Sequence, residues 1–156
     1  LSIRSTFAEV AGDLADDGRK DEAQKILAKC ESLIDKKDLP YAMVSRDNSH
    51  NLYALLYLEA AYKAGNAQLA QSIDQALKKD LQQQRNYYSY LRDEREDLFT
   101  ALEGEARNNE IMLVILDDLD KAYAQKPAAI NPQPVEGRNQ PIITNIKDSG
   151  KKDSVK

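Results

Sequence analysis

Apolar residues in the first two-thirds of the chain recur at the spacing of an α-helix, with interruptions at a few sharp points. Residues 2–17 and 21–35 each carry one apolar stripe, which predicts two amphipathic helices. Gly18 stands where a left-handed residue would end the first, so residues 2–35 predict a helical hairpin. The positions predicted to face the core are Ile3, Phe7, Val10, Ala11 and Leu14, then Ala23, Ile26, Leu27, Cys30, Leu33 and Ile34.

A long connection follows this hairpin and leads into the most apolar part of the chain. Residues 36–50 lose the helical spacing at Pro40 and are rich in turn-forming residues. We expect an ordered loop here, packed against the body through Leu39, Tyr41 and Met43. Residues 49–64 are apolar on nearly all sides, which predicts a third helix buried between several neighbours, and Gly65 ends it.

Two longer helices are predicted after Gly65. The fourth begins near Ala67 and has a coiled-coil-like seam of alternating three and four residue steps, at Ala70, Ile73, Leu77, Leu81, Gln84, Tyr88 and Leu91. The fifth covers about 94–125, and Gly104 and Asn108-Asn109 are expected to bend it. Its predicted inner positions are Leu98, Leu102, Ala106, Leu113, Leu116, Leu119 and Tyr123.

The composition changes after residue 126. Four of the five prolines lie in 127–156, and a Lys-, Asp- and Ser-rich end follows, which is typical of an extended or flexible tail. Residues 141–146 (PIITNI) are the apolar segment of this tail that we expect to make a contact. The sequence therefore predicts an all-α domain of about five helices over 1–126, arranged as helical hairpins, and a tail over 127–156.

The two hairpins resemble each other when Gly18 is placed on Gly65. Five residues later both copies have alanine (Ala23, Ala70), and eight residues later both have isoleucine (Ile26, Ile73). Small residues at such positions let paired helices approach closely, as in tetratricopeptide repeats. The offset is 47 residues instead of the usual 34, and the long 36–50 loop accounts for the excess. We interpret the chain as a tetratricopeptide-like array.

Four segments in order, LSIRSTFAEVAGDLADDGRKDEAQKIL, LPYAM, YLEAAYKAGNAQLA and NYYSYL, resemble the C-terminal soluble domain of multi-pass membrane proteins of Bacteroidetes. Those proteins are of unknown function and are similar to protein O-mannosyltransferase-like glycosyltransferases. The resemblance covers about 1–125 and implies a periplasmic location, with the cytoplasm as the alternative. It implies no site residues here, because the catalytic residues of that family lie in its membrane part. Leu1 in place of Met also agrees with a piece of a longer protein.

The charge distribution narrows the choice of partners. The formal net charge is -4, and residues 128–156 alone carry five basic against three acidic residues. An acidic body does not favour nucleic acid, which needs a basic surface. There is no run of about 18 apolar residues, so we expect contact with a membrane only through a parent chain.

No set of residues predicts a reaction, a metal or a cofactor. Cys30 lies on an apolar stripe and His50, the only histidine, lies among helix-capping residues, so both are expected to be structural. A calcium loop at Asp13 fails, because its third and twelfth positions are Ala15 and Gln24. We interpret Asp117, Asp118 and Asp120 as a solvated face, and an enzyme in its own right is the least supported function.

Aromatic residues are the best candidates for binding. Helical repeats hold extended peptides in grooves lined by Tyr and Arg, although most buried tyrosines are simply core. The candidate groove residues are His50, Tyr57, Tyr87, Tyr88, Tyr90 and Arg92. We expect a non-catalytic interaction domain that binds a protein or peptide between the first helix, the third helix and the 36–50 loop. The alternative is a structural homo-oligomerisation module that uses the fourth and fifth helices.

Overall fold

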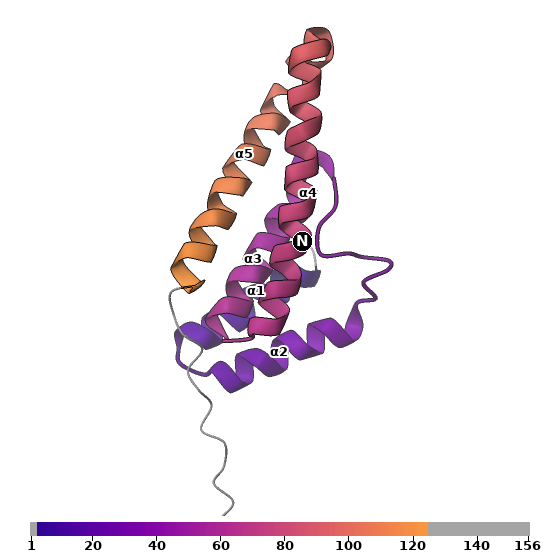
Figure 1. The fold of residues 1–156 in the computed structure, drawn as a ribbon. Coiled ribbons are helices and arrows are strands. Elements are labelled where there is room, and N and C mark those ends of the chain that lie inside the picture. The colour runs from indigo at the N-terminus through magenta and orange to yellow at the C-terminus, as the bar shows by residue number, and fades with distance from the viewer. Residues whose placement is uncertain (1–2, 125–156) are drawn as a thin grey trace, which may run out of the picture.

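The computed structural model describes residues 3–124, and within them every predicted helix is present (Figure 1). No strand occurs in this range, so the all-α prediction is confirmed. The tail 127–156, including 141–146, lies outside the described residues. The elements are α1 (Ile3–Asp16), α2 (Lys20–Leu33), the short 3-10 helix η1 (Arg46–Asn48), α3 (Ser49–Lys63), α4 (Ala67–Glu94) and α5 (Glu96–Ala124).

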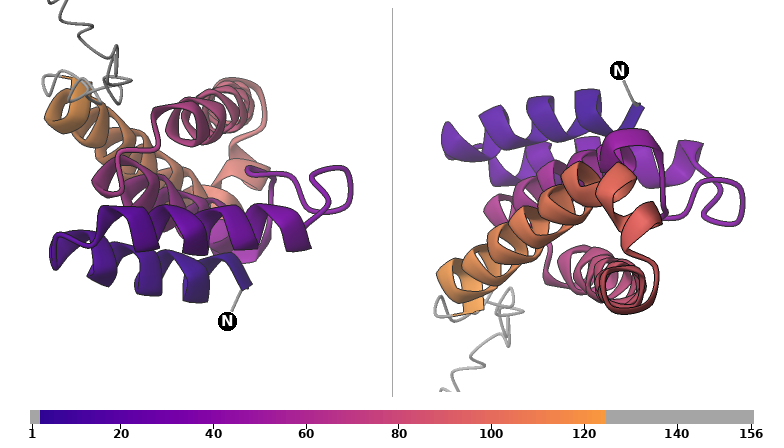
Figure 2. Two further views of the ribbon diagram at one scale, coloured as in Figure 1. Left: turned by 90° about the horizontal axis from the view of Figure 1, so that it is seen from below. Right: turned by 90° about the horizontal axis from the view of Figure 1, so that it is seen from above.

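Helix α3 is the centre of the arrangement. The hairpin of α1 and α2 lies on one side of it, and the longer hairpin of α4 and α5 lies on the other (Figure 2). Its most extensive contacts are with α1, followed by α4 and α5, whereas α2 packs mainly on α1 and does not reach α4. Only Arg95 separates α4 from α5, so the two longest helices turn back on each other sharply.

The same cap ends both α1 and α3, as the alignment of Gly18 with Gly65 predicts. The φ angles of these glycines are +80° and +74°, in the left-handed region. In each cap the glycine N–H and the next N–H donate to carbonyls three and five residues back, which is the Schellman arrangement. The equivalent turns are therefore confirmed, and the tetratricopeptide repeat itself stays a prediction.

We expect Gly18→Ala and Gly65→Ala each to lower the free energy of unfolding by about 1–2 kcal/mol, because a Cβ is disfavoured at positive φ. Urea denaturation of the purified variants measures this change. Gly104→Ala is the matched control, since Gly104 is helical and has open space around a Cβ. The free energy of unfolding of Gly104→Ala should rise by about 0.5–1 kcal/mol. Equal losses in all three would show that the sign of φ does not matter here.

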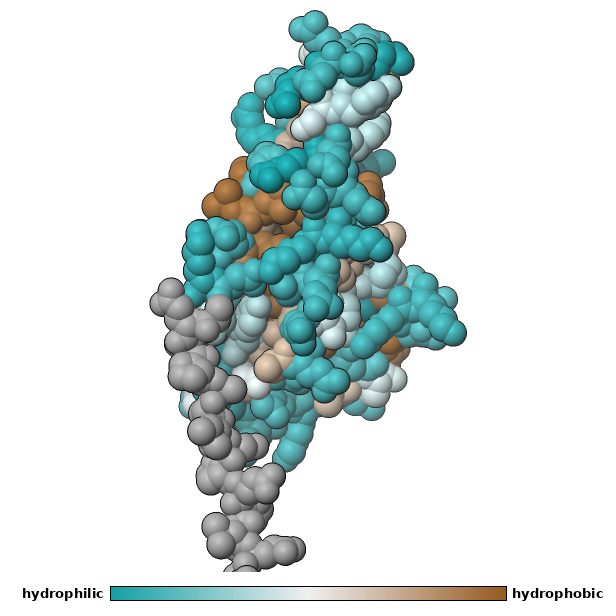
Figure 3. Space-filling model, viewed as in Figure 1, coloured by the Kyte–Doolittle hydropathy of each residue, from teal (hydrophilic) through white to brown (hydrophobic). Residues whose placement is uncertain are grey.

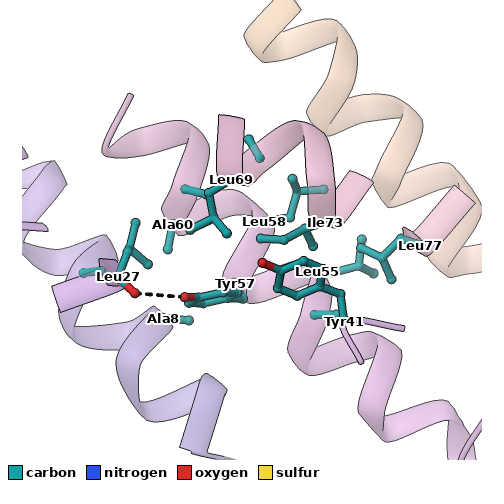
Figure 4. Close-up of a cluster of buried hydrophobic side chains, with 14 of the residues drawn as sticks. Ala8, Leu27, Tyr41, Leu55, Tyr57, Leu58, Ala60, Leu69, Ile73 and Leu77 are labelled. Carbon is teal, nitrogen blue, oxygen red and sulfur yellow. Dashed lines mark hydrogen bonds between the residues drawn. The ribbon is translucent and has the colours of Figure 1, made fainter. Parts of the chain in front are cut away.

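Tyr57 fills the middle of the core, where it is 0% exposed (Figure 4). Its ring from α3 lies among Leu, Ile and Ala side chains of the surrounding helices. Its hydroxyl donates to the carbonyl O of Leu27 at 3.3 Å or to the Glu31 carboxylate at 3.0 Å, both on α2. A large side chain with a polar tip thus joins α3 to α2 at a point where the helices have few other contacts.

The predicted seam of α4 is correct at every position, from Ala70 to Leu91, because all seven residues are buried. The predicted stripe of α1 is correct only in part, because Ala11 is buried and Phe7 and Leu14 pack partly buried against the core, but the buried face is rotated away from the other two positions. Ile3 and Val10 are exposed, and the buried positions are Arg4, Ser5, Ala8, Ala11 and Ala15. Three alanines on this face allow α1 to approach α3 closely. This close packing decides which face of α1 is buried, even though Ile3 and Val10 are larger and more apolar.

The predicted inner face of α5 is correct at Leu116, which is buried, and at Leu113 and Leu119, which pack partly buried against the core, but it is wrong at Leu98. Leu98 is 43% exposed, and the buried residues are Asn109, Met112 and Leu116. The helix continues without interruption past Gly104 and the two asparagines that were expected to bend it. Asn109 lies inside because its side-chain Nδ2 donates to the carbonyl O of Leu81 on α4, 3.1 Å away.

The connection between α2 and α3 is ordered, as predicted, and polar side chains hold it. Tyr41 is buried under the Arg4 guanidinium, whose centre lies 5.0 Å from the ring centroid. Arg4 also donates to the carbonyl O atoms of Leu39 and Pro40. These contacts explain why a charged residue is buried in α1: it supplies donors to two backbone carbonyls of the loop.

A second set of polar contacts fixes the end of this connection to α4. Asn51 Nδ2 donates to Asn48 Oδ1 at 2.9 Å and to Asp80 Oδ2 at 2.7 Å. The Asn51 carbonyl Oδ1 accepts from the Met43 N–H, and Gln84 bonds to both Asn48 and Asp80. Asn48 has φ +53°, which asparagine tolerates better than most residues. We refer to Asn48, Asn51, Asp80 and Gln84 as the amide cluster.

Candidate functional site: the groove between α1 and α3

The residues predicted to line one groove do not lie together. Tyr57 is wholly buried and lines no surface hollow, so its assignment to a groove is wrong. His50 is half-buried, and its Nε2 donates to the carbonyl O of Pro40, 2.9 Å away, which gives it a structural role in the loop. Both side chains have a structural role, because the Tyr57 hydroxyl and the His50 imidazole each donate a hydrogen bond to a backbone carbonyl.

The remaining predicted residues lie on the outer half of α4. Tyr88 and Arg92 line a hollow of about 220 Å3 between α4 and α5, together with Phe99. Tyr87 and Tyr90 are exposed and do not line it. Each arginine of this hollow has a carboxylate partner: Arg85 binds Glu110 through two hydrogen bonds, Arg92 lies 3.4 Å from Asp93, and Arg107 lies 3.7 Å from Glu103. Its charge is therefore balanced and favours no class of ligand.

A larger groove lies between α1 and α3. The predicted site lay between these two helices and the 36–50 loop, but no residue of that loop and none of the predicted groove residues lines this groove. Its volume is about 340 Å3. Small residues, Ala8, Gly12 and Ala60, form its floor, and Tyr53 and Leu56 supply apolar surface. Leu56 is 46% exposed, which is unusual for a leucine in the central helix of a fold. The floor itself is largely covered, since Ala8 and Ala60 are 3% and 2% exposed, and Leu56 supplies most of the apolar surface that the described residues leave open to solvent.

Carboxylates surround this floor. Glu9, Asp13 and Asp16 stand on α1 and Glu59 stands on α3, against a single lysine, Lys63. Lys63 Nζ lies 2.8 Å from Asp16 and 3.3 Å from Glu59, so it closes one end of the groove. The hydrogen bond to Asp16 raises the pKa of Lys63 and keeps the lysine charged.

Within residues 3–124, most of the negative charge of the groove has no compensating cation. Glu9 and Asp13 make no ion pair with the rest of 3–124. The groove therefore combines an apolar floor with an excess of carboxylates, which favours a ligand that is apolar in part and positively charged in part.

A spacing signal could have identified this site from the sequence. Ala8 and Gly12 are one helical turn apart, and Glu9, Asp13 and Asp16 follow the same face. A line of small residues beside a line of exposed carboxylates marks the edge of a helix–helix contact, where the packed face of α1 meets solvent. The aromatic residues are a weaker signal, because several of the tyrosines have one edge in the core.

Another polar cluster joins α3, α4 and α5 on the inside. Asp74 is 9% exposed, and its Oδ1 has no hydrogen-bond partner among the described residues. Lys78 bonds to Asp74 and Asp120, and Asp120 accepts from the Tyr62 hydroxyl. Burial raises the pKa of Asp74, although the Lys78 hydrogen bond acts in the opposite direction. The cluster is a structural junction with a partly unsatisfied carboxylate.

We expect Asp74→Asn to become more stable relative to the native protein as the pH rises from about 3 to 6. The pKa of the Asp74 carboxyl is raised in the folded state, so the folded protein binds the carboxyl proton more tightly than the unfolded chain does. Proton binding therefore stabilises the native protein at low pH, and this stabilisation is lost as the pH rises through the folded-state pKa. Urea unfolding of both proteins over this range measures the difference. Asp118→Asn, on the exposed side of α5, controls for the change in net charge. If the free energy of unfolding of the native protein instead rises relative to that of Asp74→Asn as the pH increases, the predicted sign is wrong.

Neither a metal site nor a nucleophile is evident in the part of the chain that the structure describes. Residues 3–124 contain no group of three or more His, Cys, Asp and Glu side chains placed to hold a metal ion. Cys30 is buried, and burial raises the pKa of its thiol, which makes the thiol a poor nucleophile. Asp117 and Asp118 are exposed, as predicted, although Asp117 pairs with Lys121, whereas Asp120 is partly buried and binds Lys78.

We found no match to this chain among protein-family models, curated proteins or solved structures. None of the helices in 3–124 combines the length and the apolar character needed to cross a membrane. The resemblance to the domain of Bacteroidetes membrane proteins stays a prediction, and the α1–α3 groove is the feature from which a function can be argued.

Proposed function

We propose that this chain is a non-catalytic interaction domain that binds a protein or peptide segment in the α1–α3 groove. The observation that carries the proposal is the exposed apolar surface of Leu56 beside the small residues of the floor, with an excess of carboxylates around it. A peptide that combines apolar side chains with lysine or arginine would satisfy both parts. The groove is open and lies on two rigid helices, as is common for sites that accept an extended segment.

A selection from a displayed library of random peptides on the full chain tests this proposal. We expect the enriched peptides to combine apolar and basic residues, and their binding to weaken at least tenfold, or about 1.4 kcal/mol, in Gly12→Leu. That substitution fills the groove, and the helical backbone and open space at Gly12 indicate that the fold accepts it. Asp118→Lys, outside the groove, is the control for charge. Peptides that bind Gly12→Leu as well as the native protein would refute the proposal.

One observation favours a second candidate function, a structural homo-oligomerisation module. The seam of α4 cannot serve for this purpose, because it is buried within the chain. However, Ile111, Val114 and Ile115 are exposed on α5, where the surface of the helix is hydrophobic (Figure 3). If this patch joins copies of the chain, light scattering will show a mass that rises with concentration and falls to that of a monomer in Val114→Glu.

We further propose that the domain belongs to a larger membrane protein and lies on the periplasmic side of the membrane, with the cytoplasm as the alternative. The order of segments quoted above supports this placement. Fractionation of cells that express the full gene, followed by protease treatment of intact spheroplasts, tests it. Protection of the domain from the protease would indicate the cytoplasm.

A further inference from the structure

The part of the chain that follows α5 carries a charge opposite to that of the groove. Residues 125–156 contain six basic residues and three acidic ones, whereas 1–124 contain sixteen basic and twenty-three acidic ones. The basic residues are Lys126, Arg138, Lys147, Lys151, Lys152 and Lys156. The chain thus contains both an acidic groove and a basic segment.

The end of α5 lies at one end of this groove. Tyr123 stacks on Tyr62 of α3, with ring centroids 4.9 Å apart and an angle of 3° between the planes. Tyr62 immediately precedes Lys63, which closes the groove through Asp16. Burial raises the pKa of Tyr123; the negative charges of Glu59 and Asp16 add to this effect, and the positive charge of Lys63 opposes it. The chain therefore leaves α5 beside the groove, on the side of the molecule where α1 turns into α2 (Figures 1 and 2).

One segment of 125–156 has the composition that the groove favours. Residues 141–152, PIITNIKDSGKK, contain three of the four isoleucines of this region, followed by Lys147, Lys151 and Lys152. Apolar residues come first and basic residues second, which matches an apolar floor with carboxylates at its rim.

We propose that residues 141–152 occupy the α1–α3 groove of their own chain, with isoleucines on the floor and lysines beside Glu9 and Asp13. This inference rests on the proposed function of the groove as a peptide site. Seventeen residues lead from Ala124 to Pro141 and can span up to about 56–61 Å when extended. Helix α1, with its 14 residues, is only about 21 Å long, so the segment reaches any part of the groove.

An occupant tethered in this way regulates the site. A short tether gives a bound segment an effective concentration in the millimolar range, so an external peptide of similar composition must compete with it. The groove would then be closed to weak ligands and open only to a partner that binds more tightly, or when the tail is engaged elsewhere.

Paramagnetic relaxation in the full chain tests the inference. A nitroxide attached at Ser149→Cys reports the position of the segment, and buried Cys30 should not react. We expect the amide signals of Glu9, Gly12 and Asp13 to lose intensity, and those on the exposed face of α2 to keep it. The double variant Glu9→Lys/Asp13→Lys should lower the docked fraction about two- to tenfold, since each exposed ion pair contributes little. Adding Lys151→Glu and Lys152→Glu to this variant should restore it.

Each other outcome refutes the inference in a distinct way. Intensity losses centred on Ile111 and Val114 would place the segment on α5. Losses that appear only when a spin-labelled chain is mixed with an isotope-labelled one would identify a second copy as the occupant. If no losses occur while selected peptides still bind and respond to Gly12→Leu, the tail inference fails and the peptide-binding function stands. If neither the tail nor any peptide binds the groove, both fail.

Discussion

Tyr57→Ala is expected to lower the free energy of unfolding by about 3–5 kcal/mol, the range found when large buried aromatic side chains are truncated. The ring projects from α3 and is 0% exposed. It fills space between α3 and α2, two helices that have few other contacts with each other. The domain as a whole should be stable by about 5–15 kcal/mol, so this one change removes a large part of its stability. Thermal and urea unfolding followed by circular dichroism measure the loss.

Two further variants separate packing from hydrogen bonding at Tyr57. Tyr57→Phe keeps the ring and removes the hydroxyl that bonds to Leu27 and Glu31, which should cost about 1 kcal/mol. Tyr90→Ala removes a tyrosine that is 58% exposed and should change stability by less than about 0.5 kcal/mol. A loss in Tyr57→Ala no larger than that in Tyr90→Ala would show that Tyr57 is not a core residue.

Asn51→Ala is expected to lower the free energy of unfolding by about 2–4 kcal/mol, because it removes three hydrogen bonds that are buried or partly buried. Asn51 is 0% exposed and bonds to Asn48, Asp80 and the Met43 N–H. Its loss should also free the connection between α2 and α3. Urea unfolding measures the change in stability. Hydrogen exchange at the Met43 amide should be faster in the variant than in the native protein under native conditions, through local opening and not through global unfolding.

An exposed amide on the same kind of helix provides the control for Asn51. Asn86 on α4 accepts one surface hydrogen bond from Gln82, at 3.1 Å. Asn86→Ala should leave both the stability and the Met43 exchange rate nearly unchanged. If Asn51→Ala lowers the stability without any change at Met43, the amide cluster supports α3 and α4 but does not hold the loop.

The periodicity of apolar residues predicts the helices well and the orientation of some of them poorly. In α4 the seam from Ala70 to Leu91 is correct because large apolar residues occupy one face only. In α1 the larger residues are spread around the helix, and the alanines that face α3 carry little signal of their own. A pattern of hydrophobicity does not distinguish a small residue that permits close packing from one on the surface.

The buried polar residues are the part of the structure that the sequence predicts least well. Arg4, Asn51 and Asn109 are buried, yet each is a residue type that is usually exposed. Their positions follow from backbone carbonyls and loop contacts that exist only once the chain has folded. The sequence predicted a site between the first helix, the third helix and the 36–50 loop. The candidate groove shares the two helices but not the loop, and its lining was not predicted, because Tyr57 is needed inside the core.

The long hairpin of α4 and α5 has a consequence for cooperativity. Helix α4 has 28 residues and is about 42 Å long, whereas α3 has 15 residues and is about 22 Å long. The distal part of the hairpin, around Arg95, therefore extends beyond α3, and most of its residues from 92 to 101 are exposed (Figure 1). This tip can fray and re-form without disturbing Tyr57 or the groove, so the molecule should unfold as two units, with the tip as the less stable one.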